Sequence, residues 1–195
     1  MKERGMIFNG EMVRAILDGR KTQTRRIIKN QREGECWTVK PAQSPRYAGH
    51  THDWWLPTGT QPYSALPACP HGAVGDRIWV RETFSVVPDH DEPAGFSALL
   101  YAADGVGPYG KWTPSIHMPR LASRILLEIT DVRVERLRNM SQDDARAEGV
   151  IAASGPMEAG LAFRELWDSI YGIESWKVNP WVWVIEFKRV EGGAA

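Results

Sequence analysis

Apolar and polar residues alternate most clearly in two segments, which predicts β-strands. In residues 124–137 the alternating apolar positions up to Ile129 share one face, whereas those from Val132 onward lie on the other. Successive side chains of a strand point to opposite faces, so this change of parity around Thr130–Asp131 predicts a bulge or a bend. Residues 181–188 form the second such strand, with aromatic and aliphatic side chains on one face and Glu186 on the other.

Shorter segments predict further strands. They lie at residues 6–8, 22–29 and 78–82, with weaker candidates at 84–87 and 96–102.

Helical periodicity appears in three segments. Residues 10–18 place apolar side chains on one stripe, and Gly19 follows as a C-terminal glycine. Ser141 is a typical N-cap for a helix through Glu148, which Gly149 ends. A third helix is predicted over residues 157–171.

Residues 30–75 differ from the rest of the chain. They are rich in proline and glycine and show little periodicity, so we expect a long, mostly irregular insertion. The pair Trp54–Trp55 and Tyr63 would form either a lid or groove wall, or a layer packed over the core.

The order of elements is strand, helix, strands, helices, strand. With 195 residues the chain fits a single domain. Curved strands without a βαβ rhythm favour an α+β fold, namely a small mixed β-barrel with helices at its mouth and the long loop insertion.

Composition limits the classes of function. The formal net charge is zero, so a general nucleic-acid-binding surface is not indicated. Basic residues cluster between Arg20 and Arg32, where they would either hold phosphates or protect a solvated edge strand. The two cysteines indicate no disulfide framework. Without a membrane-length apolar run or a signal-peptide pattern, we expect a cytoplasmic protein with no membrane partner.

The segment Gly19-Arg20-Lys21-Thr22-Gln23-Thr24 is the strongest candidate for chemistry. A lysine and a hydroxyl at this spacing, on the extended side of a turn, can point into one pocket. The cysteines and histidines match no standard zinc spacing, so no metal is expected.

Several motifs together resemble an ASCH domain, a member of the PUA-like superfamily of RNA-binding β-barrels. They are Gly19-Arg20-Lys21-Thr22-x-Thr24, Gly75-Asp76-x-Ile78-x-Val80, Ala145-x-x-Glu148-Gly149 and Val184-Ile185-Glu186-Phe187. Segments 79–82 and 114–120 are similar to ASCH proteins of phages and prophages. One bacterial branch hydrolyses N4-acetylcytidine to cytidine. That resemblance implies catalytic roles for Lys21, Thr24 and Glu148, without a cofactor.

Amide cleavage needs a nucleophile, a proton carrier and a group that stabilises the oxyanion. Thr24 would attack if Lys21 had a pKa low enough to accept its proton. Alternatively, a charged Lys21 would stabilise the oxyanion while Glu148 activates water. The rival functions are a non-catalytic module that binds RNA or a modified nucleotide, and a ribonuclease that uses the same basic cleft.

Other residues are candidates for contacts with a modified cytidine nucleoside or RNA. Phe8 and Trp79 would either stack on a base or pack in the core. Arg81 and Arg120 would contact phosphate or a base edge, or form ion pairs. The remaining candidates are Arg20, Arg26 and His117.

Overall fold

The computed structural model describes residues 1–32, 34, 36–88, 99–151 and 158–190. The strands of this part are β1 (Glu3–Ile7), β2 (Gln23–Ile27), β3 (Thr38–Pro41), β4 (His52–Trp55), β5 (Ser64–Ala65), β6 (Arg77–Arg81), β7 (Phe84–Val86), β8 (Leu99–Tyr101), β9 (Leu126–Arg136) and β10 (Trp181–Arg189). The helices are α1 (Gly10–Leu17), α2 (Gln142–Ala147), α3 (Glu158–Tyr171) and α4 (Ile173–Val178), with 3-10 turns η2 (Ala102–Asp104), η3 (Ser115–His117), η4 (Arg120–Ala122) and η5 (Leu137–Asn139). The predicted α+β class is confirmed.

The main sheet has the strand order β1-β6-β9-β10-β2. β1 runs parallel to β6, and the other neighbours are antiparallel. The expected barrel is not closed within the described residues, because no backbone ladder joins β1 to β2. A side chain spans the two edges instead: Arg26 Nη2 of β2 donates to the Ile7 carbonyl of β1 at 2.8 Å.

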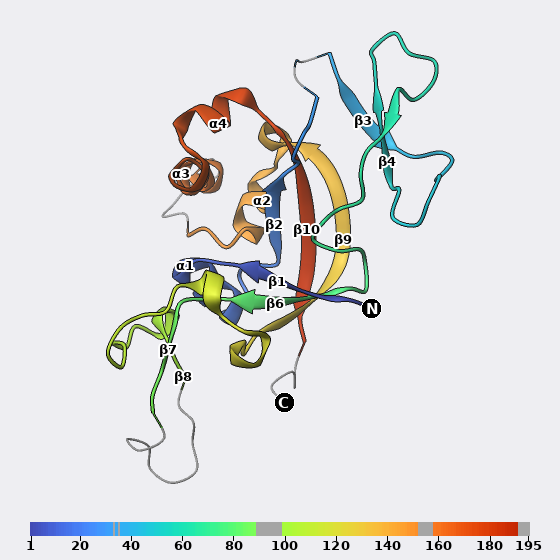
Figure 1. Ribbon diagram of the computed structural model, residues 1–195. Coiled ribbons are helices and arrows are strands. Elements are labelled where there is room, and N and C mark those ends of the chain that lie inside the picture. The colour runs from blue at the N-terminus through green and yellow to red at the C-terminus, as the bar shows by residue number, and fades with distance from the viewer. Residues whose placement is uncertain (33, 35, 89–98, 152–157, 191–195) are drawn as a thin grey trace.

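β10 separates two apolar cores. Trp183 and Ile185 pack into the first core, on one face of the sheet. Val182 and Val184 pack on the opposite face, where Phe163 of α3 joins them. The helices α2, α3 and α4 cover this second face (Figure 1). β10 is therefore buried on both sides, which anchors α3 beside β2.

The bend expected in the long strand is confirmed. Glu186 of β10 pairs with Asp131 of β9, whereas the next residue, Phe187, pairs with Ile129. Thr130 is the extra residue of this bulge, which explains the change in side-chain parity.

Helix ends follow their local signals. Asn9 caps α1, and Gly19 follows α1 with φ 75°. The Ser141 side chain accepts from the Asp144 amide, which completes a capping box at α2. The short helix α4 was not predicted from the sequence.

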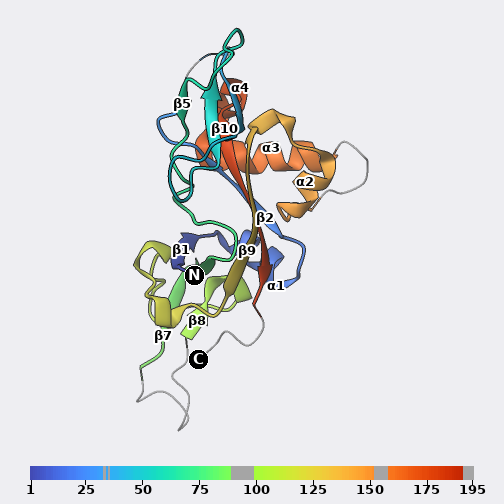
Figure 2. The same ribbon diagram turned by 90° about the vertical axis from the view of Figure 1, so that its right-hand side faces the viewer.

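The expectation for residues 30–75 needs correction. Most of them lie outside strands, but β3, β4 and β5 form a three-stranded sheet (Figure 2). β4 gave no alternating signal because three of its four residues are buried. Pro41 is tolerated because it ends β3, an edge strand. Trp54 packs edge-on against Trp181 at 5.9 Å, so it is part of the core and not of a lid.

β7 and β8 form a separate antiparallel pair. They overlap the two weaker predicted strands, at residues 84–87 and 96–102. Residues 96–98 of the second segment lie outside the described residues. No described helix has the length and apolarity to cross a membrane.

Candidate active site

Lys21 is fixed where the chain turns from α1 into β2. After Gly19, the amides of Arg20 and Lys21 both donate to the Ala15 carbonyl at 2.9 Å. The Lys21 backbone then forms an isolated β-bridge with Glu148. The lysine is only 2% exposed, so its amine needs a partner inside the protein.

Glu148 supplies that partner. It is the C-cap of α2, and Lys21 Nζ donates to both its backbone carbonyl and its Oε2 at 2.8 Å. The sequence places an anion at the negative end of a helix dipole, which is unfavourable. The Lys21 ammonium offsets this because it contacts the Glu148 carbonyl and the carboxylate together.

Arg25 completes the buried group, and sequence analysis did not select it. Its Nη1 lies 3.2 Å from Glu148 Oε1, and its Nη2 lies 3.3 Å from Glu135 and 3.4 Å from Asp144. The Arg25 side chain is entirely buried. Both oxygens of Glu148 therefore face cations.

Burial lowers the pKa of Lys21, because an ammonium loses its hydration there. Attraction to Glu148 and the hydrogen bond donated to it oppose this effect, and Arg26 and Arg25 reinforce it. The net direction is downward. The guanidinium of Arg20 pairs instead with Asp18, at 2.9 Å.

Thr24 lies beside this pair and is not hydrogen-bonded to it in the structure. The register pairs Thr24 with Ile185 and Arg25 with Val184. The side chains of Thr24 and Arg25, which are neighbours on β2, therefore leave the backbone on opposite faces of the sheet. β2 is an edge strand, and Thr24 and Glu148 both line one small pocket of about 20 Å³ beside α3. Lys21 and Glu148 are thus in direct contact, whereas Thr24 lines the same small pocket from a strand position of opposite parity and forms no hydrogen bond to either of them.

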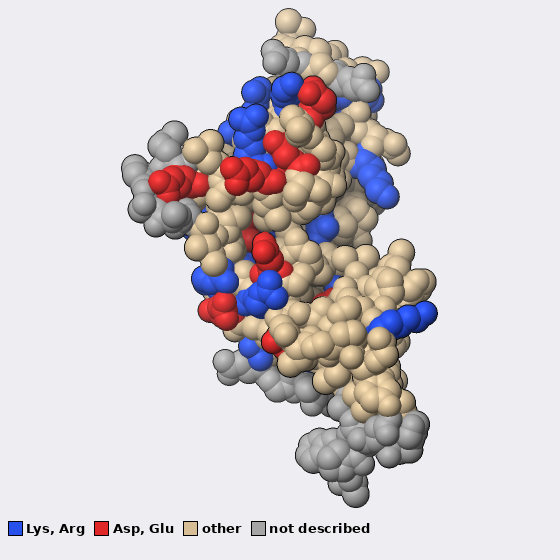
Figure 3. Space-filling model, turned by 90° about the vertical axis from the view of Figure 1, so that its left-hand side faces the viewer, with Lys and Arg blue, Asp and Glu red and all other residues tan. Residues whose placement is uncertain are grey.

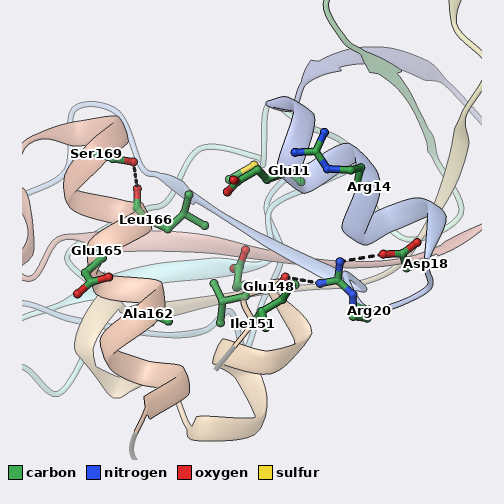
Figure 4. A pocket seen from close by; sticks show the side chains of 13 residues that line it. Glu11, Arg14, Asp18, Arg20, Glu148, Ile151, Ala162, Glu165, Leu166 and Ser169 are labelled. Atoms are coloured by element: carbon green, nitrogen blue, oxygen red, sulfur yellow. Dashed lines mark hydrogen bonds and ion pairs between the residues drawn. The ribbon is translucent and has the colours of Figure 1, made fainter. Parts of the chain in front are cut away.

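A larger cleft of about 640 Å³ adjoins the small pocket and shares Met12, Glu148 and Leu166 with it. Side chains of α1 and α3 face each other across the cleft, and Glu148 lies between them (Figure 4). This volume is within the range of small-molecule sites.

The cleft is not basic. Glu11, Asp18, Glu148 and Glu165 line it together with only two cations, Arg14 and Arg20. Figure 3 shows acidic and basic side chains intermixed on this side of the molecule. The basic cluster of the sequence is dispersed because Arg25 is paired with buried carboxylates and Arg26 with the Ile7 carbonyl.

The predicted substrate-binding residues are divided by the structure. Arg20 lines the cleft and donates to the Gly149 carbonyl at 2.8 Å, and Arg26 lines the small pocket. Phe8 is 2% exposed and packs edge-on against Phe187, so it belongs to the core.

The other four predicted residues line neither the cleft nor the small pocket, because they belong to the β1–β6 side of the sheet. The Trp79 ring packs on Gly5, with the Arg81 guanidinium 5.3 Å from its centre. Arg81 also donates to the Ile116 carbonyl. His117 is exposed. Arg120 forms an ion pair with Glu3 at 2.9 Å.

Within the described residues, no cluster of three or more histidine, cysteine or acidic residues is arranged to hold a metal ion. Comparisons with protein-family models, with curated proteins and with solved structures give no match.

Proposed function

We propose that this protein is an ASCH-type member of the PUA-like superfamily and hydrolyses the acyl amide of N4-acylated cytidine. The observation that carries the proposal is the buried Lys21–Glu148 pair, joined at 2.8 Å where a cleft of about 640 Å³ meets the pocket of Thr24. The curved mixed sheet, whose open edges are spanned by Arg26, supports the fold assignment (Figure 1).

The proposed reaction has two stages. The Thr24 hydroxyl oxygen attacks the acyl carbon, and the hydroxyl proton passes to the Lys21–Glu148 pair, which holds it as one unit. The carbon–N4 bond breaks as this proton moves to N4, which leaves as the amino group of cytidine. Water then attacks the acyl carbon of the Thr24 ester, and one of its protons passes through the Lys21–Glu148 pair to the Thr24 oxygen as the carbon–oxygen bond breaks. This restores the hydroxyl, and the acid that leaves ionises to the carboxylate. The lowered pKa of Lys21 supports its role as proton acceptor.

Charge favours an uncharged nucleoside in this cleft. A ribonuclease or RNA-binding module would have to bring phosphates close to Glu11, Asp18 and Glu165. The carboxylates of the cleft outnumber its two arginines, so the cleft would not attract a polyanion, whereas cytidine carries no charge. The amidohydrolase is therefore the function that the geometry supports best.

The test measures the release of cytidine from N4-acetylcytidine by chromatography. We expect Lys21→Met, Thr24→Ala and Glu148→Gln each to lower kcat/KM by about 100-fold or more. Thr22→Ala is the matched control, because Thr22 is an exposed threonine on the same segment. It should retain wild-type activity.

Intact-mass measurement separates the two chemical routes. An acetyl group carried by the wild-type protein and absent from Thr24→Ala supports attack by Thr24. Full activity of Thr24→Ala would contradict it and favour water activated by Glu148. A folded wild-type protein that releases no cytidine would refute the amidohydrolase, and cleavage of labelled RNA that Lys21→Met removes would replace it with the ribonuclease.

A further inference from the structure

Arg25 connects the buried carboxylate of Glu148 to two acids that lie nearer the surface. Its Nη1 lies 3.2 Å from Glu148 Oε1. Its Nη2 lies 3.3 Å from Glu135 of β9 and 3.4 Å from Asp144 of α2, which we call the outer acids. The side chains of the outer acids are 25% and 20% exposed, whereas that of Arg25 is entirely buried. No step of the proposed hydrolysis uses this guanidinium, so its burial needs another explanation.

Glu148 is the acid that depends on Arg25. The outer acids have a second guanidinium, because Arg133 contacts them at 2.6 Å and 2.9 Å. Among the described residues, the only other cation at ion-pair distance from Glu148 is Lys21. The buried Nε of Arg25 has no hydrogen-bond partner. A buried guanidinium stays charged, so it favours an ionised acid beside it.

Lys21 and Arg25 hold Glu148 from its two oxygens. Lys21 Nζ donates to Oε2 at 2.8 Å, and Arg25 Nη1 donates to Oε1 at 3.2 Å. The two cations are four residues apart on one extended segment, where alternate residues share a face. Charge-assisted hydrogen bonds at both oxygens fix the plane of the carboxylate, so Oε2 stays on the Lys21 amine.

The charge of Arg25 also affects how many protons the Lys21–Glu148 pair carries. A nearby cation stabilises the carboxylate and destabilises the ammonium, so it lowers both pKa values of the pair. Burial is the main cause of the lowered pKa of Lys21, and the charges of Arg26 and Arg25 act in the same direction.

Other ionisable side chains surround the pair. Those packed around it are Arg26 of β2, Glu135 and Arg133 of β9, Asp144 of α2 and Tyr171 of α3. Those that line the cleft beside Glu148 are Glu11, Arg14, Asp18, Arg20 and Glu165. None of these cations lies at ion-pair distance from Glu148, so Arg25 is the arginine that holds it directly.

We propose that Arg25 is a positioning residue for the proposed hydrolysis: it keeps Glu148 ionised and oriented on Lys21, so that the pair can take the Thr24 proton. Without Arg25 the pair would stay protonated to higher pH. The catalytic part of this inference rests on the proposed function. The hold on Glu148 belongs to the fold, so it can be measured without a substrate.

NMR of protein labelled at the glutamate carboxyl carbon follows the protonation of Glu148, and Glu148→Gln identifies its signal. We expect the midpoint of this titration to move to higher pH by about 1 pH unit or more in Arg25→Met. Arg133→Met is the matched control, because it removes a guanidinium from the outer acids and none from Glu148. Its midpoint should stay near that of wild type. Equal ionisation of Glu148 in wild type and folded Arg25→Met, or an equal shift in Arg133→Met, would overturn the proposal.

Arg25→Lys covers the case in which Arg25→Met does not fold. It keeps a cation at the buried position, but an ammonium lacks the fork that reaches Glu148 and the outer acids together. Its midpoint should therefore lie above that of wild type, by less than in Arg25→Met. An unchanged midpoint in Arg25→Lys would show that the guanidinium does not position Glu148.

The pH profile of kcat/KM for N4-acetylcytidine connects this hold to catalysis. Its rising limb should move to higher pH in Arg25→Met together with the Glu148 titration, because the pair accepts a proton only after it has lost one. A purely structural role would lower kcat/KM by the same factor at every pH, and that result would remove Arg25 from the reaction. A moved titration in protein that releases no cytidine would support the hold on Glu148 and refute the hydrolysis instead.

Discussion

Lys21 is a residue of the proposed site whose protonation is affected by the fold. Its folded-state pKa lies below the ordinary value of 10.5. Between these two pKa values the unfolded chain binds more protons than the native protein, so the free energy of unfolding rises with pH in that window. The gain is complete once the pH exceeds the unfolded value.

We therefore predict that Lys21→Met removes a rise in stability with pH that the wild type shows below about pH 10.5. Urea unfolding of both proteins at several pH values measures it. Burial raises the pKa of Cys69 to about 11, which has the opposite effect on stability above pH 9.0. The difference between wild type and variant cancels that contribution. Parallel pH curves for the two proteins would show that Lys21 does not titrate abnormally.

The same residue shows how far sequence could define the site. The glycine-ended helix and the Ala145-x-x-Glu148 motif led to Lys21 and Glu148, and the structure brings them into contact. Arg25 was missed because its partners Glu135 and Asp144 come from β9 and α2, which only the folded sheet brings together. Its even spacing from Lys21 and Gln23 was the one available signal, since alternate residues share a face of a strand.

Among the elements, the end of α2 tolerates little change at Gly149. Gly149 has φ +86°, and a Cβ there would lie 2.7 Å from the Ala15 Cβ and 2.8 Å from the Lys21 Cβ. Gly172 has the same φ, +86°, but a Cβ at that position would have no neighbour within 4 Å. The two sites therefore separate backbone strain from steric overlap.

We predict that Gly149→Ala destabilises the protein more than Gly172→Ala does. Both substitutions incur about 1–2 kcal/mol from a left-handed backbone, and the overlap at Gly149 adds about 1–3 kcal/mol. Chemical denaturation measures the difference. Gly149→Ala should also reduce the proposed hydrolysis, because the displaced backbone carries Glu148. Equal losses of stability at the two glycines would show that the contact with Lys21 relaxes freely.

Elements were predictable where one local signal dominated. The bulge in β9 followed from side-chain parity, and α2 followed from its capping residues. β4 is mostly buried and β5 has only two residues, so neither could show a period of two. They are specified by tertiary contacts such as that between Trp54 and Trp181.

At the scale of the whole molecule, the small pocket depends on how close α3 lies to α1 and β2. Leu166 of α3 lines both this pocket and the cleft, together with Met12 of α1. A pocket of about 20 Å³ accommodates one water-sized group, which is about the size of a methyl group. If the proposed hydrolysis takes place here, the distance between the helices limits the length of the acyl chain that fits.

We predict that Leu166→Ala shifts preference toward longer acyl groups. The ratio of kcat/KM for N4-butyrylcytidine to that for N4-acetylcytidine should rise about 10-fold or more, since each methylene accommodated in an apolar pocket contributes about 1–3 kcal/mol. Leu161→Ala is the matched control: it is 59% exposed on the same helix and lines neither cavity. An unchanged ratio in active Leu166→Ala protein would show that the acyl group binds elsewhere in the cleft. A similar rise in both variants would instead indicate a general loosening of α3.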